Sequence, residues 1–319
     1  MDRARSRLAL AVVTGATALF VGAAAPIPIR AANWLAPGPD MARALGEKPS
    51  ECLAEAATPG EEYEIEVGRA AFRTPLTLGG QASRAGLACE NCHRGGRNNP
   101  YFLFPGVSGA PGTADVTTSV FSSHRGDGID NPKPIPDLSG PRALLKVSRD
   151  PKSKDLKIFI HGLVTQEFDG AEPPPAVLDG LVAYVRALRP DACKANPVQA
   201  IRAETLMDDA IRATNAAGAA FAHKDVPTAL LMISSARTQI GLIYERYDAP
   251  DLAGERTALH AADLDLAAIQ EGLRTSRPDT VVRLTAWIVQ ARALTNKLVQ
   301  SEGKSLFDPA RLAAAVAAH

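Results

Sequence analysis

The sequence predicts an all-α protein built in two parts. Hydrophobic residues make up 46% of the 319 residues but aromatic residues only 5%, so the core must consist largely of Ala, Leu and Val. Such a core suits close-packed helices better than sheets. A chain of this length holds about two domains. The distribution of glycine and proline marks the boundary between the two domains, because 20 of the 24 prolines and 20 of the 25 glycines lie at or before position 197. A loop-rich first part is therefore followed by a part that is mostly helix.

The first 25 residues have the pattern of a secretory signal peptide. Three arginines precede an apolar run over 8–25, which ends in small residues. Cleavage is expected near Ala24 or Ala25, with a later site near Ala32 as an alternative. An uncleaved run of this length could instead anchor the chain in a membrane. In both cases the rest of the chain lies outside the cytoplasm, in the periplasm or exported further, where thiols are oxidised.

The first domain is expected over residues 33–196 and holds two longer helices. One covers 61–72, and the other covers 177–188 with its apolar residues on one face. Gly68 permits two helix backbones to approach closely, and Tyr184 can pack over their crossing as a core aromatic residue. We therefore expect these two helices to cross.

The second domain is expected over residues 197–319, as an antiparallel bundle of four helices followed by a short helix that begins at Pro309. Its first helix is expected over about 198–221. Apolar residues recur at steps of three and four in the other three segments. These segments cover 230–247, 259–273 and 281–298. The domain carries no cluster of metal-ligating or nucleophilic residues in sequence, so we expect it to serve docking or scaffolding.

The most informative peptide is CENCH, from Cys89 to His93, which has the form used for covalent attachment of c-type haem. Two thiols separated by two residues can reach the two vinyl groups on one edge of a haem. His93 then lies under the iron as its proximal ligand. The sequence therefore predicts one covalently bound haem c, held by Cys89, Cys92 and His93.

Three other interpretations of this peptide are weaker. A thioredoxin-like dithiol belongs at the start of a helix after a strand, and no βαβ pattern surrounds the motif. A zinc site needs a second pair of ligands, and the other two cysteines are isolated from each other in sequence. The third is a plain disulfide between near neighbours. The export signal favours haem, because haem is attached to such motifs outside the cytoplasm.

The residues around the motif resemble a known family. The stretch GRAAFRTPLTLGGQASRAGLACENCHRGG, residues 68–96, resembles a haem domain of the bacterial di-haem cytochrome c peroxidase and MauG-like family. The segment EFDGAEPPPAVLDGLVAYVRAL, at 167–188, is similar to the last helix of cytochrome c domains in that family. The resemblance covers roughly 61–190 and implies a cytochrome c-like haem domain. This chain has a single CxxCH whereas the di-haem enzymes have two, so their two-haem mechanism does not carry over.

A methionine is not expected as the sixth iron ligand, because all four Met residues lie outside 61–190, the part of the chain that carries the resemblance to a haem domain. Two histidines remain inside it. His124 lies in a Gly- and Pro-rich loop whose place after the motif is similar to the distal loop of a peroxidase-type haem, and it is the favoured ligand. His161 lies in the apolar, helix-like segment KIFIHGLV and is the alternative, although a packed core histidine explains it as well.

Cys52 and Cys193 bracket the haem domain and are the only other cysteines. In an oxidising compartment we expect them to form a disulfide. The alternative is that both thiols are free.

The charge and the motif together define the expected function. There are 35 basic and 35 acidic residues, which excludes the strong basic field that non-specific nucleic-acid binding requires. We expect an exported mono-haem c-type cytochrome that transfers single electrons and meets a redox partner protein. The alternative is a peroxidase-related haem enzyme with an open or displaceable sixth iron site, and a haem-based sensor is a third class. No oligomeric state is predicted, and membrane association is expected only if the N-terminal segment stays uncleaved.

Overall fold

The computed structural model describes residues 27–118, 120–124, 126–140, 145–193 and 198–318. Helices dominate this part of the chain and the strands are two or three residues long, which confirms the all-α prediction. The predicted signal peptide lies outside the described residues.

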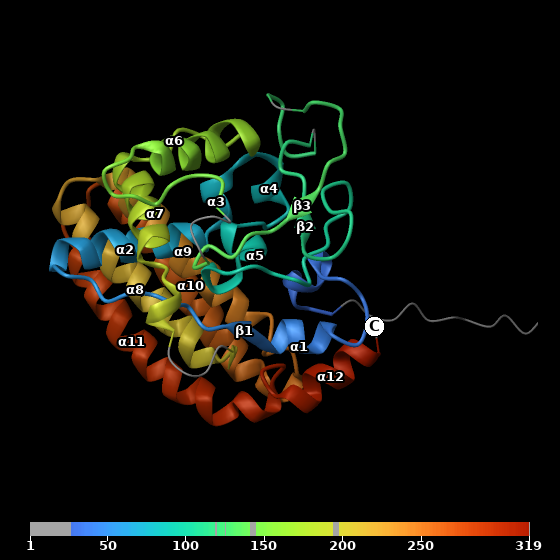
Figure 1. Ribbon diagram of the computed structural model, residues 1–319. Helices are drawn as coiled ribbons and strands as arrows, with labels where there is room; N and C mark the ends of the chain where they lie inside the picture. The colour runs from blue at the N-terminus through green and yellow to red at the C-terminus, as the bar shows by residue number, and fades with distance from the viewer. Residues whose placement is uncertain (1–26, 119, 125, 141–144, 194–197, 319) are drawn as a thin grey trace, which may run out of the picture.

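The first half carries short elements separated by long connections (Figure 1). In chain order they are η1 (Arg30–Trp34), α1 (Met41–Gly46), β1 (Glu47–Pro49), α2 (Pro59–Phe72), α3 (Pro75–Leu78), α4 (Gly80–Arg84), α5 (Cys89–Cys92), η2 (Arg94–Gly96), β2 (Thr113–Ala114), β3 (Lys133–Pro134), α6 (Asp155–Gly162), the π-helical turn η4 (Leu163–Glu167), α7 (Pro175–Ala187) and η5 (Pro190–Ala192).

The second half consists mainly of long helices. In chain order its elements are β4 (Val198–Ala200), α8 (Ala203–Ala222), α9 (Val226–Tyr244), η6 (Pro250–Leu252), α10 (Ala253–Arg274), α11 (Thr280–Ser301), η7 (Glu302–Lys304) and α12 (Pro309–Ala317). The helices α8 to α11 pack in a ring, each against the next and α11 against α8. The connections between them are short, so successive helices run antiparallel.

The helices α2 and α7 cross at two glycines. A Cβ atom on Gly68 would lie 1.9 Å from the carbonyl oxygen of Gly180, and one on Gly180 would lie 2.8 Å from the backbone nitrogen of Gly68. Only glycine fits either position. Tyr184 is fully buried beside the crossing, with its ring centre 5.0 Å from that of Phe72. The close approach expected at Gly68 and the packing of Tyr184 are therefore both present.

The two halves share one hydrophobic core. Buried residues of α2 and α7 are continuous with those of α8 and α9, and Ser235 of α9 donates a hydrogen bond to the carbonyl oxygen of Ala70 in α2, at 3.0 Å. Figure 1 shows the bundle helices lying along α2 and α7. The composition change near Asn196 thus marks a change of architecture within one packed body.

The N-terminal arm joins the halves a second time. Strand β1 pairs antiparallel with β4, with Lys48 opposite Gln199. Leu312 of α12 packs against Met41 and Leu45 of α1. This pairing also explains why α8 begins at Ala203 and not near 198 as expected, since residues 198–200 are extended against β1.

One described helix, α9, is long and apolar enough to span a membrane by length and composition alone. It packs between α8 and α10, and half of its apolar window is buried within the protein. Its hydrophobicity is accounted for by the bundle core.

Candidate haem site

The first four residues of the CENCH peptide form a single helical turn, α5. Asn91 of this turn and Asn99 after it hold the turn in place. The backbone N–H of Ala88 donates to Oδ1 of Asn91, at 2.7 Å, and Nδ2 of Asn99 donates to the carbonyl oxygen of Asn91, at 2.7 Å. The chain then turns at two glycines with positive φ. A Cβ atom on Gly96 would lie 2.6 Å from the side chain of Leu188 at the end of α7. The motif is therefore held against α7 by contacts that need a glycine at 96 and the asparagines at 91 and 99.

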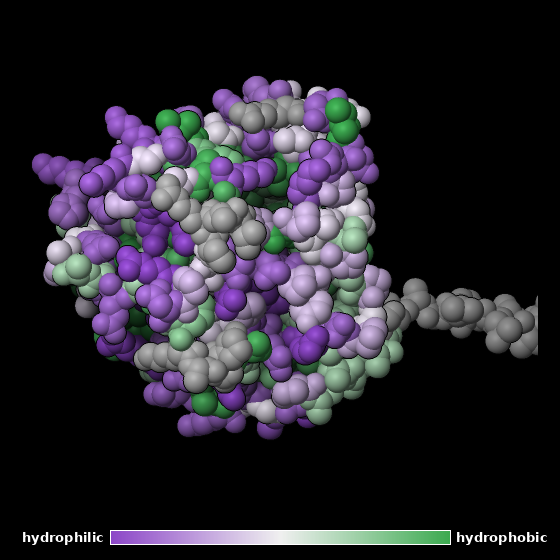
Figure 2. Space-filling view, in the orientation of Figure 1, coloured by the Kyte–Doolittle hydropathy of each residue, from purple (hydrophilic) through white to green (hydrophobic). Residues whose placement is uncertain are grey.

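This turn forms one wall of a large apolar cavity. The cavity encloses about 1450 Å³ of empty space, counted out to the solvent at its mouth, and Cys89, Cys92 and His93 line it. The other walls come from α2, α6, η4, α7 and the loops around β2 and β3. Figure 2 shows hydrophobic surface inside a hollow near α6, bordered by hydrophilic side chains. Ligand pockets are mostly apolar with a few polar groups, and this cavity has that character, so it suits a hydrophobic group.

His93 is oriented for ligation. Its Nδ1 lies 3.1 Å from the carbonyl oxygen of Pro136. Because a carbonyl oxygen only accepts, Nδ1 carries the proton and Nε2 keeps its lone pair. Burial lowers the pKa of His93 to about 4, against a smaller opposing effect of the Pro136 carbonyl, so the imidazole is neutral. A neutral imidazole with one nitrogen held by a carbonyl is the usual arrangement of a metal-ligating histidine.

The two thiols of the motif are free and buried in a low-dielectric environment. Cys89 and Cys92 do not form a disulfide. Burial raises the pKa of each thiol to about 12. A dithiol redox centre needs a lowered thiol pKa, so this environment disfavours the thioredoxin-like interpretation.

The three motif side chains are also spread along the wall. Among the described residues, no three side chains of His, Cys, Asp or Glu converge as they do around a single metal ion. Yet Cys89, Cys92 and His93 all line the same cavity. This placement suits a group with several attachment points better than one bound ion such as zinc.

A buried cluster of charges lies behind α5. The guanidinium of Arg73, at the end of α2, is 3.0 Å from Oε1 of Glu51 and 3.0 Å from Oδ1 of Asp209 in α8. Its Nε is 3.9 Å from Oε2 of Glu90, the residue after Cys89, and Oε1 of Glu90 accepts from the N–H of Gly95 at 2.9 Å. These contacts connect the haem motif to the bundle through one arginine.

The arginines set the ionisation of this cluster. Burial alone raises the pKa of Asp209 and Glu51, but the charges of Arg73 and Arg69 outweigh it, so both pKa values lie below their ordinary range. The hydroxyl of Tyr184 also donates to Glu51, at 2.5 Å. Both carboxylates are therefore ionised and paired at neutral pH. Sequence reasoning missed this cluster because its members are far apart along the chain.

The structure does not bring His124 or His161 to the cavity. The side chain of His124 is 64% exposed and its Nδ1 lies 2.9 Å from Oδ1 of Asp169. The side chain of His161 is 38% exposed and its Nε2 lies 2.8 Å from Oε2 of Glu172. Each imidazole faces a carboxylate on the protein surface, and neither is among the residues that line the cavity.

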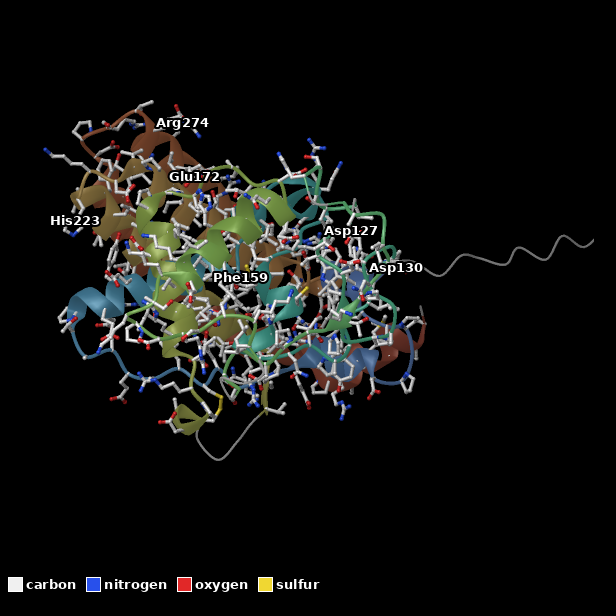
Figure 3. All side chains as sticks on the ribbon, turned by 45° about the horizontal axis from the view of Figure 1, so that its top comes forward. Asp127, Asp130, Phe159, Glu172, His223 and Arg274 are labelled. Carbon is white, nitrogen blue, oxygen red and sulfur yellow. A yellow bond between two sulfur atoms is a disulfide. The ribbon has the colours of Figure 1, made fainter. Side chains whose placement is uncertain are left out.

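Cys52 and Cys193 form a disulfide, with 4.5 Å between their Cα atoms (Figure 3). The bond joins the segment before α2 to the segment after α7, 141 residues apart. Arg97 lies beside it, with Nη1 3.7 Å from Sγ of Cys52, and its Nε donates to Asp137 at 2.8 Å. The disulfide therefore closes the haem-motif half into a single covalent loop.

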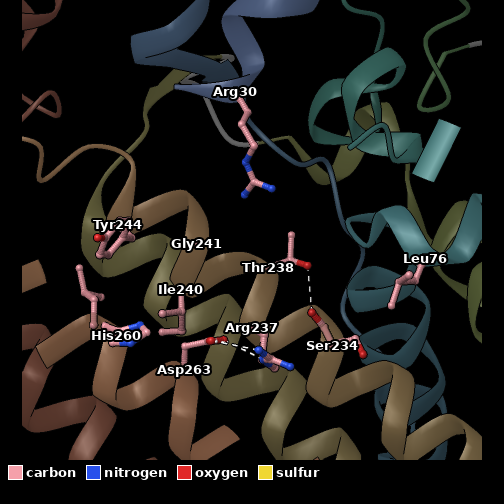
Figure 4. A pocket seen from close by; sticks show the side chains of 11 residues that line it. Arg30, Leu76, Ser234, Arg237, Thr238, Ile240, Gly241, Tyr244, His260 and Asp263 are labelled. Atoms are coloured by element: carbon pink, nitrogen blue, oxygen red, sulfur yellow. Dashed lines mark hydrogen bonds and ion pairs between the residues drawn. The ribbon is translucent and has the colours of Figure 1, made fainter. Parts of the chain in front are cut away.

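A second pocket, drawn in Figure 4, lies between the N-terminal arm, α9 and α10. It encloses about 910 Å³, counted out to solvent, and its charged groups are already paired: Arg237 with Asp263 at 2.7 Å, and Arg30 with Glu245. His260 is the only imidazole among its lining residues. The pocket has no group of residues comparable to Cys89, Cys92 and His93.

No protein-family model, curated protein or solved structure matches this chain.

Proposed function

We propose that this protein is an exported mono-haem c-type cytochrome that transfers single electrons. One observation carries the proposal: CENCH forms the wall of a large apolar cavity, with His93 held by Pro136 so that Nε2 keeps its lone pair. The proposed cytochrome c-like domain is supported further by the crossing of α2 and α7 at Gly68 and Gly180.

The residues present fit a haem. Cys89 and Cys92 would form the two thioether bonds, and His93 would be the proximal ligand. A bound haem supplies one-electron exchange between ferric and ferrous iron. The apolar walls exclude water and lower the local dielectric, which is one of the ways a protein sets a reduction potential.

The charge cluster behind the motif would act on the same site. Glu90 and Arg73 lie behind α5, and Arg73 pairs with the ionised carboxylates of Glu51 and Asp209. Charges near a haem influence its reduction potential, and fixed pairs do so without rearranging. The bundle, through Asp209, thus helps to position the charges around the haem motif.

Electron exchange with a partner protein would take place at the cavity mouth. Lys133 and Lys146 are exposed and belong to the cavity lining, so the mouth carries positive charge. A partner with an acidic surface would be attracted to this rim, and salt would slow the association.

The second candidate is a peroxidase-related haem enzyme. One observation favours it, since neither His124 nor His161 lines the cavity and the sixth iron position would then be open. However, the described residues that line the cavity include no Asp, Glu or second His to move protons, as peroxide cleavage requires. Electron transfer is therefore the function that the site supports better.

Export of the chain is part of the proposal. The N-terminal sequence has the pattern of a signal peptide, and the Cys52–Cys193 disulfide fits an oxidising compartment. No described feature of the site requires a location in the cytoplasm.

The test is to express the full chain in a bacterium with haem-attachment machinery in its periplasm. We expect the periplasmic fraction to contain a protein that keeps a peroxidase stain after denaturing electrophoresis. The Cys89→Ser/Cys92→Ser double variant is the matched control and should lose the stain. A wild-type protein that is folded and exported but shows no stain would refute the proposal.

A further inference from the structure

His93 is the one histidine among the described residues that line the haem cavity, and no described methionine lines it. The other described histidines and methionines lie elsewhere. These residues are His124, His161, His223, His260, Met41, Met207 and Met232. His260 lines the pocket of Figure 4, and His223 lies at the left edge of the molecule in Figure 3, whereas Phe159 lies near its middle. Met207 and Met232 are fully buried in the bundle core, and Met41 is buried in the N-terminal arm.

The cavity wall formed by α6 and η4 is made of hydrocarbon. Leu156, Ile160 and Val164 are buried there, and Phe159 and Leu163 complete the lining on this side. None of these side chains has a lone pair for iron or a proton to donate. The amines of the cavity belong to Lys133 and Lys146, which are exposed at its mouth.

Phe159 lies between this cavity and an adjoining surface groove, as Val147 and Leu163 do. It lines both the cavity and an adjoining surface groove that also includes Val147, Ile158 and Leu163. Ile158 lines the groove but not the cavity, and it is 66% exposed. A small molecule that enters the groove therefore meets Phe159 before it reaches the space beside His93.

We propose that, among the described residues, His93 is the one protein ligand of the iron, and that the open position takes a small uncharged diatomic molecule, which enters past Phe159. The inference rests on the proposed haem attachment. Water is disfavoured beside the wall formed by α6 and η4, because hydrocarbon offers it no hydrogen bonds. An uncharged diatomic molecule needs none. The same wall lacks the proton donor that peroxide cleavage uses.

The first experiment uses the purified holoprotein, reduced with dithionite and exposed to carbon monoxide as the probe. We expect a high-spin ferrous spectrum that converts to a carbon monoxide complex with one molecule bound per haem. His124→Ala and His161→Ala should give the same spectrum as the wild type. A low-spin ferrous spectrum that does not respond to carbon monoxide would overturn the inference.

A lysine ligand is tested separately. If Lys133→Ala or Lys146→Ala converted a low-spin protein to a high-spin one, an amine would fill the sixth position and the inference would fail. In both of these failures the haem is still attached, so the proposed function stands. Protein without covalent haem would instead remove the proposed function and this inference together.

The entry route is tested by the rate of carbon monoxide binding after flash photolysis. Phe159→Ala should raise the bimolecular rate constant several-fold, and Phe159→Trp should lower it, because the ring controls the width of the route. Ile158→Ala is the matched control on the groove side and should leave the rate unchanged. Equal rates in all of these variants would refute entry past Phe159.

Discussion

The two halves of the chain build their cores in different ways. In the bundle, α8 to α11 fill the space between them with their own side chains, and two polar groups of its aromatic residues bond within it: Trp287 donates to the carbonyl of Ala262 and Tyr247 to that of Leu298. The first half surrounds a cavity of about 1450 Å³ instead. A haem bound there, as proposed, would pack against these apolar walls and would be part of the core of this half only.

The largest expected effect comes from removing the attachment points. In the Cys89→Ser/Cys92→Ser variant the haem is no longer bound covalently, and the cavity walls lose the group that they pack against. Amide hydrogen exchange should therefore accelerate in α6 and α7 far more than in α10 and α11. Equal acceleration in both halves would contradict this contrast, since no residue of α8 to α11 lines the haem cavity.

The disulfide should come next in size. On the chain-entropy model a loop of this length contributes roughly 5 kcal/mol, and the covalent haem reduces that figure because it already restricts the unfolded chain. We expect Cys52→Ala/Cys193→Ala to lower the free energy of unfolding by about 2–4 kcal/mol. Urea denaturation of the oxidised wild type and the variant measures this difference. A change below about 0.5 kcal/mol would show that the bond does not constrain the unfolded chain.

Gly68 tests the helix crossing. Replacing it with Ala places a methyl group 1.9 Å from the carbonyl oxygen of Gly180, so α2 and α7 must separate. We expect a loss of about 3 kcal/mol in the free energy of unfolding. Gly60→Ala is the control in the same helix, because its Cβ atom would meet no atom closer than 3.9 Å, and it should change stability by about 0.5 kcal/mol or less.

Asp209 tests the connection between the halves. Asp209→Asn removes one carboxylate from the buried Arg73 and should cost about 3 kcal/mol at neutral pH. The pKa of Asp209 is lowered in the folded protein, so its contribution is complete above the unfolded value of about 4 and is lost as the pH falls further. The difference between wild type and variant should therefore be constant from pH 6 to 8 and shrink below about pH 4.

Asp208→Asn is the control for that measurement, since Asp208 is exposed beside Asp209 on the same helix. It should have little effect on stability at any pH. If Asp209→Asn were equally neutral, Arg73 would not depend on the bundle for its charge balance.

Much of the helical structure could be predicted because it is encoded locally. The helix expected over 61–72 is observed as Pro59–Phe72, extended at its start because Thr58 accepts a hydrogen bond from the N–H of Glu61 and caps the helix. The stripes of apolar residues in the second half likewise correspond to α9, α10 and α11. Helix periodicity depends on neighbours three and four residues away, which a single sequence displays.

The parts that could not be predicted depend on partners far away in the sequence. His124 resembled a distal ligand because of its loop, but Asp169 lies 45 residues later and holds it at the surface. No local pattern in the sequence singles out Glu51, Arg73 and Asp209, and only the packing of α2 against α8 buries them together. For the site itself, the pentapeptide indicated the attachment residues, while the shape and lining of the cavity required the fold.

The central claim is that one haem is bonded to both cysteines of the pentapeptide. The most direct measurement is the intact mass of the denatured, exported protein, followed by mass mapping of its proteolytic peptides. The account predicts a mass increase of one haem, confined to the peptide that contains Cys89 and Cys92. An exported, folded protein whose two thiols are both unmodified would contradict it.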